Sequence, residues 1–157
     1  MKTAIALAAA GLMSCGFAAT PAAAWHLAPA GNFTGDGNTS ATKNGITLPC
    51  KAHFTGTINS KGIGHVTGGS FKTTTGPAGA CEQVQLVNLP WKSIARTGTT
   101  GKIYNVQFNA PLGLDCGPGT LVVHVKNGII SFTDQPLPPG CTVTGKITTS
   151  PAIRIVQ

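Results

Sequence analysis

The segment Ile46–Ile58 constrains the fold more than any other part of this 157-residue chain. Its even positions are mostly apolar, and its odd positions carry Thr, Pro, Lys and His. Alternation with a period of two predicts a β-strand with one buried and one solvated face. An Asn44-Gly45 pair stands just before the segment, and this dipeptide favours the tight turn of a β-hairpin. We therefore expect an antiparallel sheet in which Cys50 points to the buried side.

Turn-forming residues divide the rest of the chain into further short segments. The expected strands are Asn32–Lys43, Ile46–Ile58, Ile63–Thr75, Trp91–Thr97, Ile103–Ala110, Leu121–Lys126, Ile129–Thr133, Cys141–Thr149 and Ala152–Val156. Asn32–Lys43 is polar and alternates weakly, which is typical of an edge strand. Cys81–Asn88 fits either a short strand or one helical turn. About eight or nine strands without a fixed repeat indicate an all-β sandwich or barrel. We favour an antiparallel β-sandwich of the immunoglobulin-like or jelly-roll type.

Residues 1–24 resemble an export signal, which leaves residues 25–157 as a single domain. Lys2 precedes an apolar stretch, and Ala22-Ala23-Ala24 suits cleavage before Trp25. No later apolar run is long enough for a transmembrane helix, so we expect a secreted, extracellular protein.

The segment Leu12-Met13-Ser14-Cys15 offers an alternative, because it resembles a lipobox. Lipidation of Cys15 would anchor the protein to a membrane. The apolar stretch ahead of Cys15 is short and small residues continue to Ala24, which favours the released form.

Four cysteines remain after Ala24, namely Cys50, Cys81, Cys116 and Cys141. An even number in an exported chain predicts two disulfides, for which three pairings exist. A zinc site is not favoured, because no two of these cysteines have CxxC spacing. Two of the cysteines flank the Asn59–Gly62 turn and the other two flank the Asn127-Gly128 turn, so we favour Cys50–Cys81 and Cys116–Cys141. Each bond would contribute about 3 kcal/mol on the chain-entropy model.

The sequence carries no catalytic or metal-binding motif. Its acids are Asp36, Glu82, Asp115 and Asp134, and its histidines are His26, His53, His65 and His124. Glu82 and Asp115 are a conceivable carboxylate pair, but an Asp beside a Gly/Pro turn is usually a turn residue. The histidines lack metal-ligand spacing, and GxSxG and phosphate-loop motifs are absent. We expect a non-enzyme without cofactor or metal.

The basic residues of the chain are scattered singly. After Lys2 is set aside, ten Lys and Arg stand against four acids, with no aromatic stripe between the cations. Nucleic-acid binding is therefore not expected, whereas the net positive charge favours a weak attraction to anionic cell surfaces.

Apolar residues gather in the two loops that carry Cys116 and Cys141. Leu112 and Leu114 precede Cys116, and Leu137 stands among prolines before Cys141. They form either an apolar contact surface at one end of the sandwich or a cap on the core. Trp91 is a candidate for the same contact, with a core position as the alternative.

Several segments resemble a known family. They are Ile46–Gly56 (ITLPCKAHFTG), Leu89-Pro90-Trp91, Cys116–Thr120 (CGPGT) and Leu137–Ala152. In order, and with all four cysteines, they resemble the secreted protein activator of alkane oxidation (PraB) of Gram-negative bacteria. The resemblance implies an extracellular protein that helps growth on hydrocarbons by dispersing or emulsifying them, and it supplies no catalytic residues.

The first hypothesis is therefore a secreted, non-enzymatic protein that contacts hydrocarbon or another lipid-like apolar surface. The alternative is a structural or adhesive subunit of the cell surface or biofilm matrix, which would self-associate by strand addition at Asn32–Lys43. A small-ligand or glycan-binding module is a third option.

Overall fold

The computed structural model describes residues 24–157 of the chain. The lipidation alternative at Cys15, and the predicted signal peptide apart from Ala24, lie outside the described residues.

Eleven strands and one short 3₁₀ helix make up the described part. In chain order they are β1 (His26–Ala28), β2 (Gly31–Lys43), β3 (Ile46–Ile58), β4 (Gly64–Thr73), η1 (Cys81–Gln83), β5 (Gln85–Val87), β6 (Trp91–Ala95), β7 (Thr100–Asn109), β8 (Cys116–Lys126), β9 (Ile129–Leu137), β10 (Cys141–Ser150) and β11 (Arg154–Val156). The all-β prediction is confirmed.

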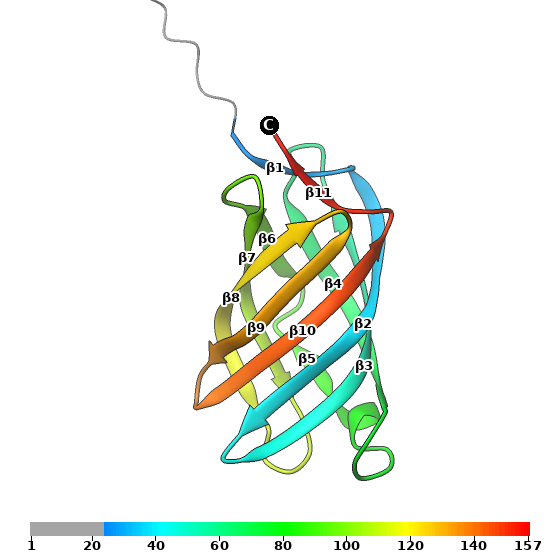
Figure 1. Cartoon of the computed structure of the whole chain (residues 1–157), viewed down its shortest axis with the longest axis vertical. Coiled ribbons are helices and arrows are strands. Elements are labelled where there is room, and N and C mark those ends of the chain that lie inside the picture. The colour runs from blue at the N-terminus through cyan, green and yellow to red at the C-terminus, as the bar shows by residue number, and fades with distance from the viewer. Residues whose placement is uncertain (1–23) are drawn as a thin grey trace, which may run out of the picture.

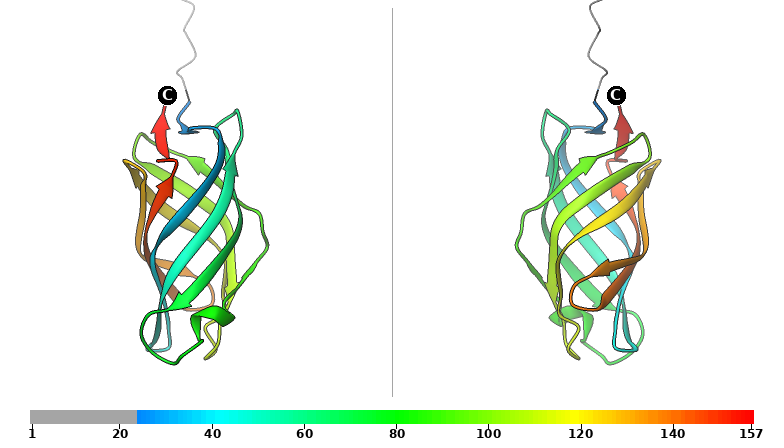
Figure 2. Two further views of the ribbon diagram at one scale, coloured as in Figure 1. Left: turned by 90° about the vertical axis from the view of Figure 1, so that its right-hand side faces the viewer. Right: turned by 90° about the vertical axis from the view of Figure 1, so that its left-hand side faces the viewer.

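Eight of the strands close into a barrel, so the predicted sandwich is wrong (Figures 1 and 2). The order around the wall is β7-β6-β4-β3-β2-β10-β9-β8, and antiparallel pairing of β7 with β8 joins the two ends. The strand pairs β3–β4, β7–β8 and β9–β10 each contain a register shift. Such irregularities increase local twist and bend, which lets one sheet curl onto itself instead of splitting into two layers.

Strand β2 lies inside the sheet, so the prediction of an edge strand at Asn32–Lys43 is also wrong. It pairs with β3 on one side and with β10 on the other. The weak alternation of β2 has a different cause, since Gly35 and Gly37 occupy inward positions between Phe33 and Thr39. A Cβ at Gly37 would lie 2.9 Å from the Ile147 Cα of β10, so only glycine allows the two strands to approach this closely.

Several element boundaries differ from the sequence expectations. Residues 81–88 contain both proposed structures, a 3₁₀ turn followed by the short strand β5. Strands β8 and β9 extend to Cys116 and Leu137, into regions rich in Gly and Pro. His26–Ala28, which lie outside every expected strand, form β1, which pairs with β11.

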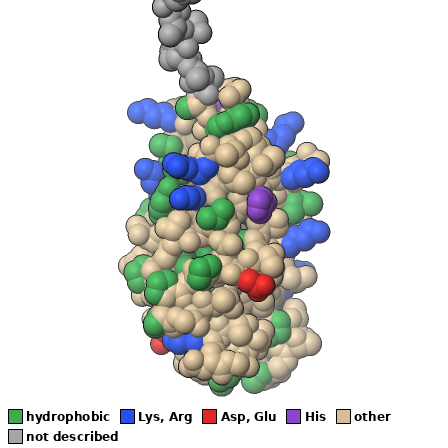
Figure 3. Space-filling view, turned by 60° about the vertical axis from the view of Figure 1, so that its left-hand side comes forward, with side chains coloured by type: hydrophobic (Ala, Val, Ile, Leu, Met, Phe, Trp, Pro, Cys, Tyr) green, Lys and Arg blue, Asp and Glu red, His purple; other side chains and the backbone are tan. Residues whose placement is uncertain are grey.

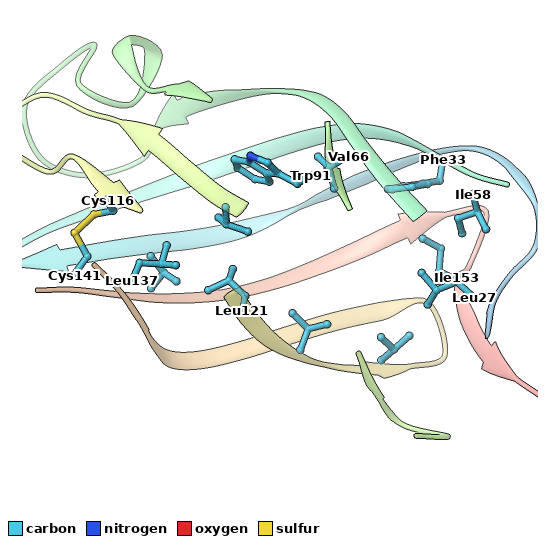
Figure 4. Packing of buried hydrophobic residues seen from close by; sticks show 14 residues of the cluster. Leu27, Phe33, Ile58, Val66, Trp91, Cys116, Leu121, Leu137, Cys141 and Ile153 are labelled. Carbon is cyan, nitrogen blue, oxygen red and sulfur yellow. A yellow bond between two sulfur atoms is a disulfide. The ribbon is translucent and has the colours of Figure 1, made fainter. Parts of the chain in front are cut away.

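The two ends of the barrel are closed in different ways. The upper end in Figure 1 is covered by the β1–β11 pair, and Leu27 and Ile153 are buried beneath it. The lower end carries η1 and a small core cluster that includes Leu48 and Leu114. The main core lies between these ends, as Figure 4 shows.

Candidate functional site

Both disulfides lie at the lower end of the barrel. Cys50–Cys81 joins β3 to η1, and Cys116–Cys141 joins the starts of β8 and β10 (Figure 4). This is the pairing that the flanking turns favour in the sequence. Sequence separations of 31 and 25 residues give each bond about 3 kcal/mol of stabilisation on the chain-entropy model.

Hydrogen bonds also hold η1 against the end of β4. The Thr73 backbone N–H and hydroxyl donate to the Glu82 carboxylate at 3.0 and 2.6 Å. The Cys81 N–H donates to the same Thr73 hydroxyl at 3.1 Å. The hydrogen bond from the Thr73 side chain is the largest of the causes that hold the pKa of Glu82 below its usual value, with a smaller contribution from Lys72. We call the contact of Glu82 with Thr73 the η1 latch.

Two adjoining apolar cavities occupy the barrel interior. The lower cavity has a volume of about 80 Å³ and the upper cavity a volume of about 90 Å³. They share the lining residues Phe54, Trp91, Val106, Leu121 and Phe132, which form a layer between them. No charged residue lines the lower cavity. A cavity with such a lining suits an apolar group.

The wall beside the lower cavity is not closed by main-chain hydrogen bonds. Strand β4 pairs with β6 only at Gly64–Val66, and β5 pairs only with β7. Thr67–Thr73 and Gln85–Val87 therefore face each other without a ladder between them, and we call this gap the β4–β5 seam. Figure 2 shows the segment that contains β5 curving along the outside of the barrel. Side chains, not backbone, seal the wall here.

The residues proposed for apolar contact lie in different environments. Leu112 is 53% exposed, whereas Leu114 and Leu137 are 0% and 1% exposed. Trp91 is 5% exposed, and its indole N–H donates to the Val87 carbonyl at 2.7 Å. Leu114 and Leu137 thus cap the core, and Trp91 is a core residue that borders both cavities. Contact with an external apolar surface stays a prediction for Leu112 alone.

The acids and histidines are not assembled into a reactive site. Asp115 accepts a hydrogen bond from the Ala110 N–H at 3.2 Å, as expected of a turn residue, and Glu82 belongs to the η1 latch. On the outer face, Asp36 and His53 form an exposed pair at 2.7 Å across β2 and β3. Within residues 24–157, no three His, Cys, Asp or Glu side chains are close enough to hold a metal ion. The same residues contain no helix long and apolar enough to span a membrane.

Cations concentrate at the upper end of the barrel, as Figure 3 shows for one face. They are Lys61, Lys92, Arg96, Lys102, Lys126 and Arg154. Asp36 lies midway along β2, and the other three described acids lie in η1, the loop before β8 and the second half of β9. The upper end is therefore the positive end of the molecule.

The sequence pattern did not reveal the cavities. Phe54, Phe71, Leu86, Phe108 and Phe132 line the lower cavity and are only partly buried. Alternation marks Phe54 and Phe108 as inward-facing, but it does not say how far apart opposite walls stand.

Comparison with known proteins connects this architecture to a family. A family model described as alkane oxidation protein activator PraA/PraB-like matches residues 1–157, the whole chain. No curated protein and no solved structure matches the sequence. The chain belongs to the PraA/PraB-like family of alkane oxidation protein activators.

Proposed function

We propose that this protein is a secreted, non-enzymatic accessory of alkane oxidation that contacts hydrocarbon outside the cell and disperses it. The observation that carries the proposal is the family match over the whole chain. An apolar interior without a charged lining residue in its lower cavity supports contact with hydrocarbon. Two disulfides suit a protein that works in an oxidising compartment and at an oil–water interface.

A dispersal assay tests this function directly. Purified residues 25–157 should lower the tension of a hexadecane–water interface and slow the coalescence of a hexadecane emulsion. The control is an unrelated basic protein of similar size with two disulfides. Equal effects of the two proteins would reject the proposal. Recovery of unchanged hexadecane is expected, and any oxidised product would contradict the non-enzymatic role.

The site of cleavage decides where the protein acts. We expect a mature chain that begins at Trp25 and carries two disulfides, so that reduction adds the mass of four hydrogens. Intact-mass spectrometry measures both properties. A diacylglyceryl group on Cys15 would instead place the protein on a membrane and contradict its secretion.

The structural or adhesive alternative has less support. It relied on strand addition at Asn32–Lys43, but β2 is paired along both sides. Size-exclusion chromatography over a range of concentrations separates the two functions, because a matrix subunit would elute as growing assemblies.

A further inference from the structure

We infer that the lower cavity, extended into the upper one, binds one short, unbranched, saturated hydrocarbon, which it takes up through the β4–β5 seam. The inference deepens the proposed function and rests on it for the class of ligand. It assigns a site and a route that dispersal at an interface does not require.

The lining of the lower cavity fits a ligand without polar groups. Phe54, Phe71, Phe108 and Phe132 supply aromatic walls. The hydroxyls of Thr39 and Thr144 already have partners, since Thr39 donates to the Cys50 carbonyl and Thr144 donates to the Asp134 carboxylate. Ser40, the remaining hydroxyl residue of the lining, lies in the outward register of β2. A carboxylate drawn inside would lose its hydration and find no free donor, whereas an alkyl chain loses nothing of that kind.

The shape of the interior favours a narrow ligand. The cavities of about 80 and 90 Å³ meet at the shared layer. An apolar cavity of about 150 Å³ in another protein takes up benzene, so a short alkyl chain needs the space of both cavities together. Phe54 and Phe132 belong to the shared layer and are only partly buried, so rotation of these rings can join the two cavities lengthwise. A linear chain can thread such a space, and a branched or ring-fused molecule of equal size cannot.

The seam is the route with the fewest bonds to break. The β1–β11 pair covers the upper end, and η1 with both disulfides closes the lower end. At the seam the contact is between side chains and Gly69 of β4. A Cβ at Gly69 would lie 2.9 Å from both the Leu86 Cδ1 and the Phe54 Cδ1 atoms, so Leu86 rests directly against this glycine. Displacement of Leu86 opens the wall without disrupting a strand ladder.

Uptake of radiolabelled hexane from the vapour phase tests the site. The full mature chain should bind about one hexane per molecule with saturation, and a highly branched alkane of equal carbon number should compete at least tenfold more weakly. Val143→Phe fills the lower cavity from β10 and should weaken uptake at least tenfold. Val122→Phe makes the same change on β8 at a side chain that is 40% exposed, and it should leave uptake unchanged.

A second variant keeps the test decisive if V143F fails to fold. Leu86→Ala removes the side chain that seals the seam, so hexane should enter and leave at least threefold faster. Uptake without saturation, equal uptake by folded V143F and V122F, or L86A kinetics equal to wild type would overturn the inference. Stronger binding of hexanoate than of hexane would overturn the assigned ligand class.

The site and the proposed function can fail separately. A wild-type protein that disperses hexadecane but takes up no hexane keeps the proposed function and rejects the site. Saturable hexane uptake by a protein that does not affect hexadecane emulsions keeps the site and rejects dispersal.

Discussion

At the scale of single residues, three inward phenylalanines lie over glycines of the neighbouring strand. Phe33 is in register with Gly56, Phe54 with Gly69, and Phe132 with Gly145. A Cβ at Gly145 would lie 2.8 Å from Phe132 Cε1, so each glycine leaves space that a ring occupies. Rings that lie against the wall occupy less of the centre, which explains how a barrel rich in Phe still contains cavities.

The first prediction concerns Gly145→Ala. The added methyl group must push the Phe132 ring toward the cavities, which should destabilise the protein by about 1–3 kcal/mol. Urea denaturation measures the change. Gly68→Ala is the matched control, because the nearest atom to its Cβ is Thr55 Oγ1 at 3.0 Å on a side chain that can rotate. Equal midpoints for the two variants would show that the ring does not depend on the glycine.

The second prediction concerns the pH dependence of the η1 latch. Hydrogen bonds from Thr73 hold the pKa of Glu82 below its ordinary value of 4.5 in the folded protein. A lowered carboxyl pKa stabilises the fold above the unfolded value, and this stabilisation is lost as the pH falls through the folded value. Glu82→Gln should therefore melt below wild type at pH 7, and the difference should shrink below pH 4.5. A difference that stays constant from pH 7 to pH 3 would contradict the role of the charge.

At the scale of elements, the sequence predicts the strands better than their closure. Alternation places β3 correctly, and turns such as Asn127-Gly128 mark the hairpins that bring the cysteines together. The prediction that β2 is an edge strand is wrong, because its inward-facing glycines make its alternation as weak as that of an exposed edge strand. The cavities could not be predicted, because period-two patterns are identical in a sandwich and a barrel. Curvature depends on register shifts and on glycines such as Gly37, which only pairing reveals.

The third prediction compares the two disulfides, which link different pairs of elements. Removal of either pair by alanine should lower the free energy of unfolding by about 3 kcal/mol, since their loops are similar in length. Only Cys50→Ala/Cys81→Ala should also speed hydrogen exchange in η1 and β5, because Cys81 fixes η1 to β3. Cys116→Ala/Cys141→Ala serves as the control. Equal exchange in both variants would show that the η1 latch holds this segment without the disulfide.

At the scale of the whole molecule, the β4–β5 seam and the positive end occupy different parts of the barrel. The seam lies on the side of the barrel, between β4 and β5. The cations listed above for the upper end lie on turns and strands there, and Lys102 also lines the upper cavity. This separation would allow the positive end to rest on an anionic surface while the seam stays open to the surroundings.

The last prediction tests that orientation. The variant Arg96→Gln/Lys126→Gln removes two positive charges from the upper end. The matched variant Lys43→Gln/Lys72→Gln removes two positive charges from the lower half. There the Lys43 ammonium donates a hydrogen bond to the Asp115 carbonyl at 2.9 Å. Each Lys or Arg near an anionic membrane contributes about 1 kcal/mol, so the upper-end variant should bind phosphatidylglycerol vesicles at least tenfold more weakly than wild type. The lower-half variant should lose much less, although both carry the same net charge. Cosedimentation at low salt measures the binding, and a rise in ionic strength should abolish it, because exposed charges are screened over about 10 Å at 0.1 M. Equal losses in the two variants would mean that net charge alone attracts the protein and that no end of the barrel faces the surface.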